Sequence, residues 1–213
     1  MKKIILLTVS VLALAGCQGL TSSKKPVSIY NLRYTGAETA ARETAGVPGV
    51  MVISEPMLPA GLETDRIALY LDQGRRLDYY ADASWAESLE DVLQDVIVQA
   101  GRAALPQMVV DSPRLNVPAN YRLAVNVLDF TPVYSAAPES APDLKVAVNF
   151  TLVHLPEKLI ISDFTLENGR AATANNLPAV AAGLEELMNS ILTAGFEKVA
   201  EATQAFEAEN ARR

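Results

Sequence analysis

The sequence of 213 residues is poor in the side chains that most metal and nucleophilic sites require. It contains one cysteine, Cys17, one histidine, His154, and one tryptophan, Trp85. A single cysteine excludes a disulfide within the chain, so the fold must be stabilised by packing alone. One histidine and one cysteine are too few for most transition-metal sites, and a Ser-His-Asp triad would have to use His154. We therefore expect no metal and no small-molecule cofactor.

The motifs that mark nucleotide and hydrolase sites are also missing. The sequence contains no G-x-S-x-G, no Walker P-loop and no G-x-G-x-x-G. Asp78 and Asp82, with Asp72 nearby, could suggest paired carboxylates for acid–base chemistry, but their place beside turns favours solvated surface acids. His154 continues the apolar positions of its strand, which favours a structural histidine. These observations predict that the protein is not an enzyme.

Positive charge is scarce as well. The chain has 18 Lys and Arg against 25 Asp and Glu, a net charge of −7 with an isoelectric point near 4.8. Nucleic-acid binding depends on Lys and Arg that neutralise phosphates, so this acidic chain predicts no nucleic-acid partner. An anionic lipid surface would repel the protein for the same reason. Contact with a membrane must then come from something other than surface charge.

What the sequence does have is a distinctive N-terminus. Met1-Lys2-Lys3 is basic and Ile4–Ala15 is almost wholly apolar, which is the layout of a signal peptide. A run of about a dozen apolar residues is short of the roughly 20 that a membrane-spanning helix needs. Leu14-Ala15-Gly16-Cys17 resembles the bacterial lipobox, in which the cysteine is acylated and becomes the first residue of the mature protein. The alternative is an ordinary signal peptide in which Cys17 has no role.

These features predict the organisation and the location of the chain. We expect residues 1–16 to be a lipoprotein signal peptide, 17–27 a lipidated tether and 28–213 a single domain. A covalent N-acyl and S-diacylglycerol lipid on Cys17 would be the anchor, since several acyl chains hold a protein firmly to a bilayer. In lipoproteins of Gram-negative cells, Asp directly after the acylated cysteine favours retention in the inner membrane. Because this position holds Gln18, the resemblance implies that the protein lies at the periplasmic face of the outer membrane. The inner membrane is the alternative.

The domain shows clear strand and helix patterns. Alternation of apolar and polar residues predicts strands at 28–34, 50–53, 67–71, 77–80, 121–132, 144–152 and 159–164. A capping box at Ser84-Trp85-Ala86-Glu87 predicts a helix that fades near Leu105, and Asn176 predicts the N-cap of a long second helix. This order predicts an α+β fold: an antiparallel or mixed β-sheet with two main helices packed on one face, in a single domain.

One cluster of side chains is a candidate for binding a partner. Tyr79, Tyr80 and Trp85 lie within seven residues of one another, directly after Arg75 and Arg76. Tyrosine, tryptophan and arginine are favoured anchors at protein interfaces. The alternative interpretation is that the aromatic side chains pack in the core and the hairpin, and that the arginines are ordinary surface residues.

The order of these features resembles the ABC-type transport auxiliary lipoprotein component family. The resemblance rests on S-I-Y-N-L at 28–32, R-I-A-L-Y-L-D at 66–72, R-L-D-Y-Y-A-D at 76–82 and W-A-E-S-L at 85–89. It extends over nearly all of the mature chain. The first of these segments departs from the family's usual Y-Y-x-L, because it keeps one tyrosine and the leucine.

The resemblance implies a docking or tethering role rather than catalysis. Members work with ABC transporters whose periplasmic part is an MCE-type substrate-binding protein, and these systems move phospholipids or other hydrophobic molecules between two membranes. The implied partners are therefore an MCE-domain protein, its ABC transporter and the membrane, with exposed strand edges and the aromatic hairpin as the expected interface. The sequence is also compatible with a homo-oligomer. The alternatives are an activator of a peptidoglycan synthase and, with no nucleophile and base in view, an envelope hydrolase.

Overall fold

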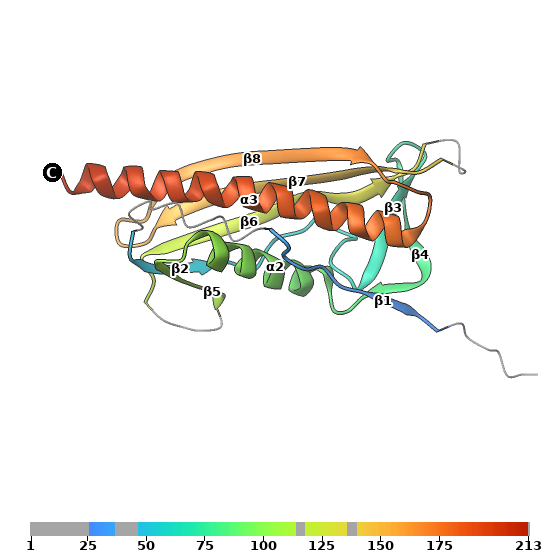
Figure 1. The fold of residues 1–213 in the computed structure, drawn as a ribbon, viewed down its shortest axis with the longest axis horizontal. Coiled ribbons are helices and arrows are strands. Elements are labelled where there is room, and N and C mark those ends of the chain that lie inside the picture. The colour runs from blue at the N-terminus through green and yellow to red at the C-terminus, as the bar shows by residue number, and fades with distance from the viewer. Residues whose placement is uncertain (1–25, 37–46, 114–117, 136–139, 213) are drawn as a thin grey trace, which may run out of the picture.

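The computed structural model describes residues 26–36, 47–113, 118–135 and 140–212. They form one mixed eight-stranded sheet with helices α2 (Leu89–Ala104) and α3 (Leu177–Asn210) on one of its faces (Figure 1). The predicted α+β fold class is confirmed. The predicted signal peptide, and the predicted tether as far as residue 25, lie outside the described residues. No helix within the described ranges combines the length and the apolar character that crossing a membrane requires.

The sheet is organised around one long central strand. The strands in chain order are β1 (Ser28–Tyr30), β2 (Gly49–Ile53), β3 (Arg66–Leu71), β4 (Arg76–Trp85), β5 (Met108–Asp111), β6 (Tyr121–Val133), β7 (Asp143–His154) and β8 (Leu159–Ala171). β6 pairs antiparallel with β7, and β7 pairs antiparallel with β8. On its other side β6 lies parallel to β2 near its start and parallel to β3 at its end. β5 then extends the sheet beyond β2, and β4 and β1 extend it beyond β3.

The core lies between the sheet and the two helices. The alternating side chains of β6 and β7 that face the helices are almost fully buried, including Leu123, Val125, Val148, Phe150 and Leu152. The apolar stripes of both helices face them: Val92, Val96 and Ala100 on α2, and Val180, Leu184, Leu187, Ile191 and Val199 on α3, are all buried. These periodicities of 2 and 3.6 residues explain why the sheet and the helices join through one apolar layer.

The predicted start of the first helix is wrong by about one turn. Ser84 lies in β4, and Trp85 is the last residue of that strand, paired with Tyr30 of β1. This parallel pairing with β1 keeps the chain extended where local sequence favoured a helix. The actual N-cap is Ser88, whose Oγ accepts the backbone N–H of Asp91 at 3.2 Å.

Two strands also differ from the prediction. β5 was not predicted, because its four residues are too few to show alternation. β1 ends at Tyr30, although the prediction ran on to residue 34. After β1 the backbone is bound by α3 side chains instead of a strand: the N–H of Arg33 donates to Glu185 Oε2 at 2.9 Å.

Candidate docking surface

The turn between β3 and β4 places two arginines at the surface. Asp72, Gln73 and Gly74 all have positive φ, and the N–H groups of Gly74 and Arg75 both donate to the Leu71 carbonyl at 3.1 Å. Such left-handed backbone is easy for glycine and tolerated by Asp, which explains the turn that the sequence predicts. Both arginines that follow are exposed.

The two arginines differ in their contacts. Arg76 Nε lies 3.1 Å from Asp72 Oδ2, and both side chains of this ion pair are about 60% exposed. Arg75 has no ion-pair partner among the described residues. Exposed ion pairs contribute little to stability, so both guanidinium groups are available to an anionic group of a partner.

The two predicted tyrosines are half-buried, and their hydroxyls have internal partners. Tyr79 donates to the Gly61 carbonyl at 2.9 Å, and the Arg66 guanidinium lies 3.8 Å from the centre of its ring. Tyr80 shares a hydrogen bond of 2.8 Å with the hydroxyl of Tyr134, which follows β6 directly. Burial and this hydrogen bond raise the pKa of the Tyr80 hydroxyl, so it stays neutral. The hairpin is thereby fixed to the end of the central strand.

Trp85 lies in the core and not on the hairpin surface. Its side chain is 3% exposed, and its ring lies 6.1 Å from that of Phe130. This placement agrees with the packing interpretation of the aromatic cluster. The other four predicted residues lie in the β3–β4 turn and on β4, where the adjacent Tyr79 and Tyr80 point to opposite faces of the sheet. We call these four residues, Arg75, Arg76, Tyr79 and Tyr80, the hairpin surface. Tyr134 completes its aromatic part, and no pattern in the sequence indicated it.

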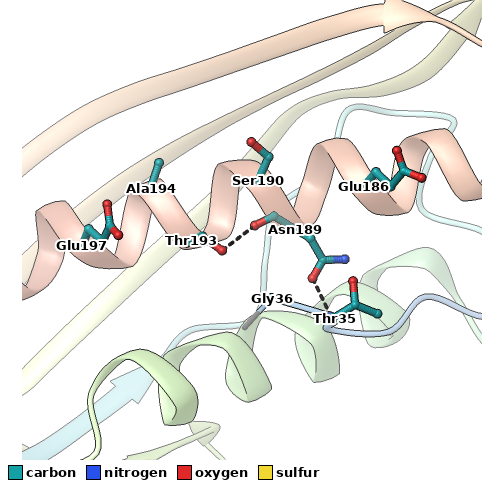
Figure 2. A pocket seen from close by; sticks show the side chains of 8 residues that line it. All are labelled: Thr35, Gly36, Glu186, Asn189, Ser190, Thr193, Ala194 and Glu197. Atoms are coloured by element: carbon teal, nitrogen blue, oxygen red, sulfur yellow. Dashed lines mark hydrogen bonds between the residues drawn. The ribbon is translucent and has the colours of Figure 1, made fainter. Parts of the chain in front are cut away.

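A groove of about 380 Å³ lies on α3, where the chain after β1 crosses the helix (Figure 2). It is lined by Thr35, Gly36, Glu186, Asn189, Ser190, Thr193, Ala194 and Glu197. The Asn189 amide binds the crossing segment, since Oδ1 accepts the N–H of Thr35 at 2.8 Å and Nδ2 donates to the Arg33 carbonyl at 2.9 Å. Gly36 on the rim is the last described residue before 47, and we assign the groove no ligand.

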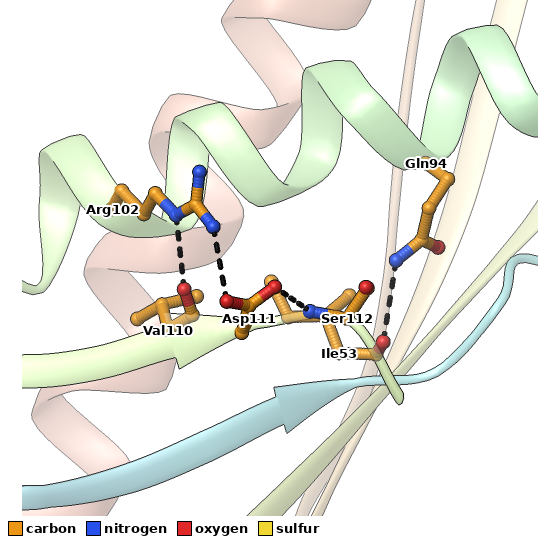
Figure 3. A network of polar contacts seen from close by, with 6 residues as sticks. All are labelled: Ile53, Gln94, Arg102, Val110, Asp111 and Ser112. Atoms are coloured by element: carbon orange, nitrogen blue, oxygen red, sulfur yellow. Dashed lines mark hydrogen bonds and ion pairs between the residues drawn. The ribbon is translucent and has the colours of Figure 1, made fainter. Parts of the chain in front are cut away.

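A second polar network attaches α2 to the sheet (Figure 3). Arg102 Nε donates to the Val110 carbonyl at 3.0 Å, and its guanidinium lies 3.3 Å from Asp111 Oδ2. Gln94 is 4% exposed, and its Nε2 donates to the Ile53 carbonyl at 3.3 Å. These bonds satisfy strand carbonyls at the ends of β2 and β5, so the network has a structural role.

The only histidine, His154, pairs with the start of β6, and the β3–β4 hairpin lies at the opposite end of that strand. His154 is 7% exposed, and its ring lies between those of Tyr121 and Phe206, at 5.1 and 4.7 Å. Its Nδ1 lies against the carboxylate of Glu157. Tyr121 donates its hydroxyl to Glu207 of α3; burial, this hydrogen bond and the nearby carboxylates raise the pKa of the tyrosine. The cluster packs the end of α3 onto the sheet, as expected for a structural histidine.

Within the described part of the chain, no three His, Cys, Asp or Glu side chains are grouped so that they could hold a metal ion. Cys17 lies outside the described residues. The structure therefore places Arg75, Arg76, Tyr79 and Tyr80 in the β3–β4 hairpin and its turn, and Trp85 in the core.

Two solved structures share this fold. The crystal structure of protein XCC0632 from Xanthomonas campestris is 21% identical, with a TM-score of 0.74, over 85% of this chain and 99% of that one. A crystal structure of an uncharacterized protein is 13% identical, with a TM-score of 0.65, over 82% of this chain and 99% of that one. At these identities the likeness concerns the fold alone. No curated protein with which the chain was compared matches it.

The sequence comparisons go further than the fold. Residues 1–18 match the prokaryotic membrane lipoprotein lipid attachment site, so the protein is a lipoprotein anchored to a membrane. Residues 30–194 match the ABC-type transport auxiliary lipoprotein component family. The chain belongs to this family, and it is an auxiliary component of ABC-type transport, a role that is typically non-catalytic.

Proposed function

We propose that the protein docks the periplasmic part of an ABC transporter of the MCE type to the membrane that carries its lipid anchor. In this account the transporter moves phospholipids or other hydrophobic molecules between the two membranes, and the lipoprotein binds without catalysing any step. The observation that carries the proposal is the presence, in one chain, of a lipid attachment site at residues 1–18 and an auxiliary transport domain at 30–194.

The arrangement of the fold supports docking near a bilayer. β1, the β3–β4 pair and the start of α3 lie toward one end of the molecule, and the C-terminal end of α3 lies at the other (Figure 1). The 34 residues of α3 span about 50 Å at 1.5 Å per residue. About ten residues separate Cys17 from β1, and a chain of that length reaches at most about 35 Å. In this proposal the end that carries β1 is therefore the end held near the membrane.

Anchoring at Cys17 changes what the interface has to achieve. Two partners held at one membrane surface meet at a raised effective concentration, so a weak interface suffices. The hairpin surface fits such a role, because it offers exposed guanidinium groups beside half-buried tyrosines. Gln18 supports the outer membrane as the site of anchoring, and separation of inner and outer membranes on a density gradient tests that choice.

In-cell crosslinking tests the docking role directly. A photo-reactive residue at Arg75 of the full-length chain should capture an MCE-type subunit, and the same residue at Asp95, on the exposed face of α2, serves as the control. Capture of a peptidoglycan synthase from Arg75 would favour the alternative activator role. If cells that make the transporter give the same crosslinked products from both positions, the result would contradict the proposal.

A further inference from the structure

The longest strand at an edge of the sheet is β8. Among the described strands it pairs only with β7, so the hydrogen-bonding groups along its other edge have no strand partner. Its 13 residues contain no proline, and the one basic residue, Arg170, is paired with Glu186 of α3. Natural edge strands are usually protected by proline, lysine or a covering segment. Beyond the bulge at Ile161, residues 162–171 continue the edge without a register shift, and within them the Gly169 N–H already donates to Asn168 Oδ1.

The two faces of β8 differ in chemistry. On the helix side, Phe164 stacks on the buried Phe150 with ring centres 5.2 Å apart, and Leu166 packs against the core beside it. Both side chains are only partly buried, because the sheet ends there. A strand added at this edge would bury them further, and it would need apolar side chains on the same face.

The opposite face of β8 is acidic. Asp163 accepts hydrogen bonds from Thr151 at 2.6 Å and from Asn149 at 3.4 Å, which places it on the face away from the helices. Thr165 and Glu167 follow on the same face, and all three residues are exposed. A strand added at this edge would lie beside the carboxylates of Asp163 and Glu167. Basic side chains on that strand would complement their charge.

A second copy of the chain fits this edge poorly in the register of full overlap. β8 is centred on Thr165, so an antiparallel pair of two complete β8 strands places Asp163 of one copy opposite Glu167 of the other. Both such cross-strand pairs would bring two carboxylates together, which destabilises a sheet. In that register the edge favours a strand of different sequence.

We propose that the free edge of β8, over residues 162–171, binds an extended segment of the transporter's periplasmic subunit in which apolar residues alternate with lysine or arginine. The backbone ladder would supply affinity, and the alternation of Phe164 and Leu166 with Asp163 and Glu167 would supply specificity. This inference rests on the proposed function, because the partner is the subunit that the anchored protein docks.

The test uses the lipidated chain in detergent and the purified periplasmic subunit of its transporter. Glu167→Lys should weaken binding roughly three- to tenfold, because it turns an attraction across the strand pair into a repulsion. Glu201→Lys makes the same charge change on the exposed face of α3 and should leave binding unchanged. Hydrogen exchange of the amides in residues 162–171 should slow when the subunit binds.

The outcomes separate the inference from the docking role. If the wild-type chain binds the subunit, but Glu167→Lys and Glu201→Lys bind equally and the β8 amides gain no protection, the inference is overturned and docking stands. If the wild-type chain binds no transporter subunit, both are overturned. A photo-reactive residue at Thr165 that links two copies of this chain would also overturn the inference.

Discussion

Asn189 of α3 holds Thr35 against the helix, through a hydrogen bond of 2.8 Å from the Thr35 backbone N–H to the amide Oδ1. The same side chain donates to the Arg33 carbonyl at 2.9 Å, and it is 7% exposed. The segment so bound directly follows β1, the strand through which the chain enters the fold from its membrane anchor. One buried amide on the C-terminal helix thereby fixes the path of the N-terminal segment.

Replacing this amide should destabilise the protein measurably. Asn189→Ala leaves the Thr35 N–H and the Arg33 carbonyl without their partner, and we expect the free energy of unfolding to fall by about 2–4 kcal/mol. Ser190→Ala, on the neighbouring exposed position, should change it by less than about 0.5 kcal/mol. Urea unfolding followed by circular dichroism measures both. Equal effects of the two substitutions would contradict the role given to Asn189.

Trp85 should behave as a core residue in solution. It is the only tryptophan, so intrinsic fluorescence reports on this one side chain. With 3% of the residue exposed, the folded protein should emit at short wavelength and resist quenching by acrylamide, and urea should abolish both properties. Strong quenching of the folded protein would return Trp85 to the candidates for partner binding.

Trp85→Ala offers an energetic test of the same placement. Truncation of a large buried aromatic side chain should lower the free energy of unfolding by about 3–5 kcal/mol. Tyr79→Ala removes a half-buried ring, so it should lower the free energy of unfolding by less than Trp85→Ala does. It should also reduce crosslinking of the transporter subunit from the hairpin surface. A Trp85→Ala variant of unchanged stability that no longer binds the partner would contradict the core assignment.

Tyr80 and Tyr121 predict how stability depends on alkaline pH. Burial, and the hydrogen bond to Tyr134, raise the pKa of Tyr80, and burial followed by the contact with Glu207 raises that of Tyr121, above the ordinary value of 10. A folded pKa above the unfolded one contributes stability that is fully present below about pH 10 and is lost as the pH rises further. Unfolding free energies measured from about pH 8 to 11 should therefore decline toward the alkaline end. Tyr121→Phe should flatten this decline, and an identical slope would contradict the assignment.

Gly195 has a packing role that helix propensity alone would not reveal. A Cβ atom at this position would lie 2.3 Å from the ring of Phe150, which is itself fully buried. Gly195→Ala should lower the free energy of unfolding by about 1–3 kcal/mol, although alanine is the better helix former. Ala205→Gly, on the exposed face of α3, should cost about 1 kcal/mol from propensity alone. A stabilised Gly195→Ala variant would show that α3 does not approach the sheet this closely.

The sequence predicts those elements whose burial pattern is regular. Leu144 to Leu152 alternate strictly and lie in β7, and the stripe from Val180 to Val199 marks the buried face of α3. The turn at Gly74 and the N-cap at Asn176 were also predicted correctly, because their chemistry is local.

The errors concern contacts between distant parts of the chain. The helix start at Ser84 failed because β1 pairs with residues 83–85, and no local pattern shows that partner. Ser88 and Asp91, four residues on from the predicted box, formed an equally good capping signal. Trp85 could not be assigned to surface or core from its neighbours in sequence, since Phe130 comes from another strand.

The proposed role of this protein depends on fixing one end of its fold to a membrane through Cys17. Intact mass spectrometry of the protein extracted from membranes measures whether that anchor is present. We expect a chain that begins at Cys17 and carries a diacylglycerol group on its sulfur and a fatty acid on its amino group. A free sulfhydryl at position 17, or a mature chain that begins at another residue, would rule out lipid anchoring at Cys17.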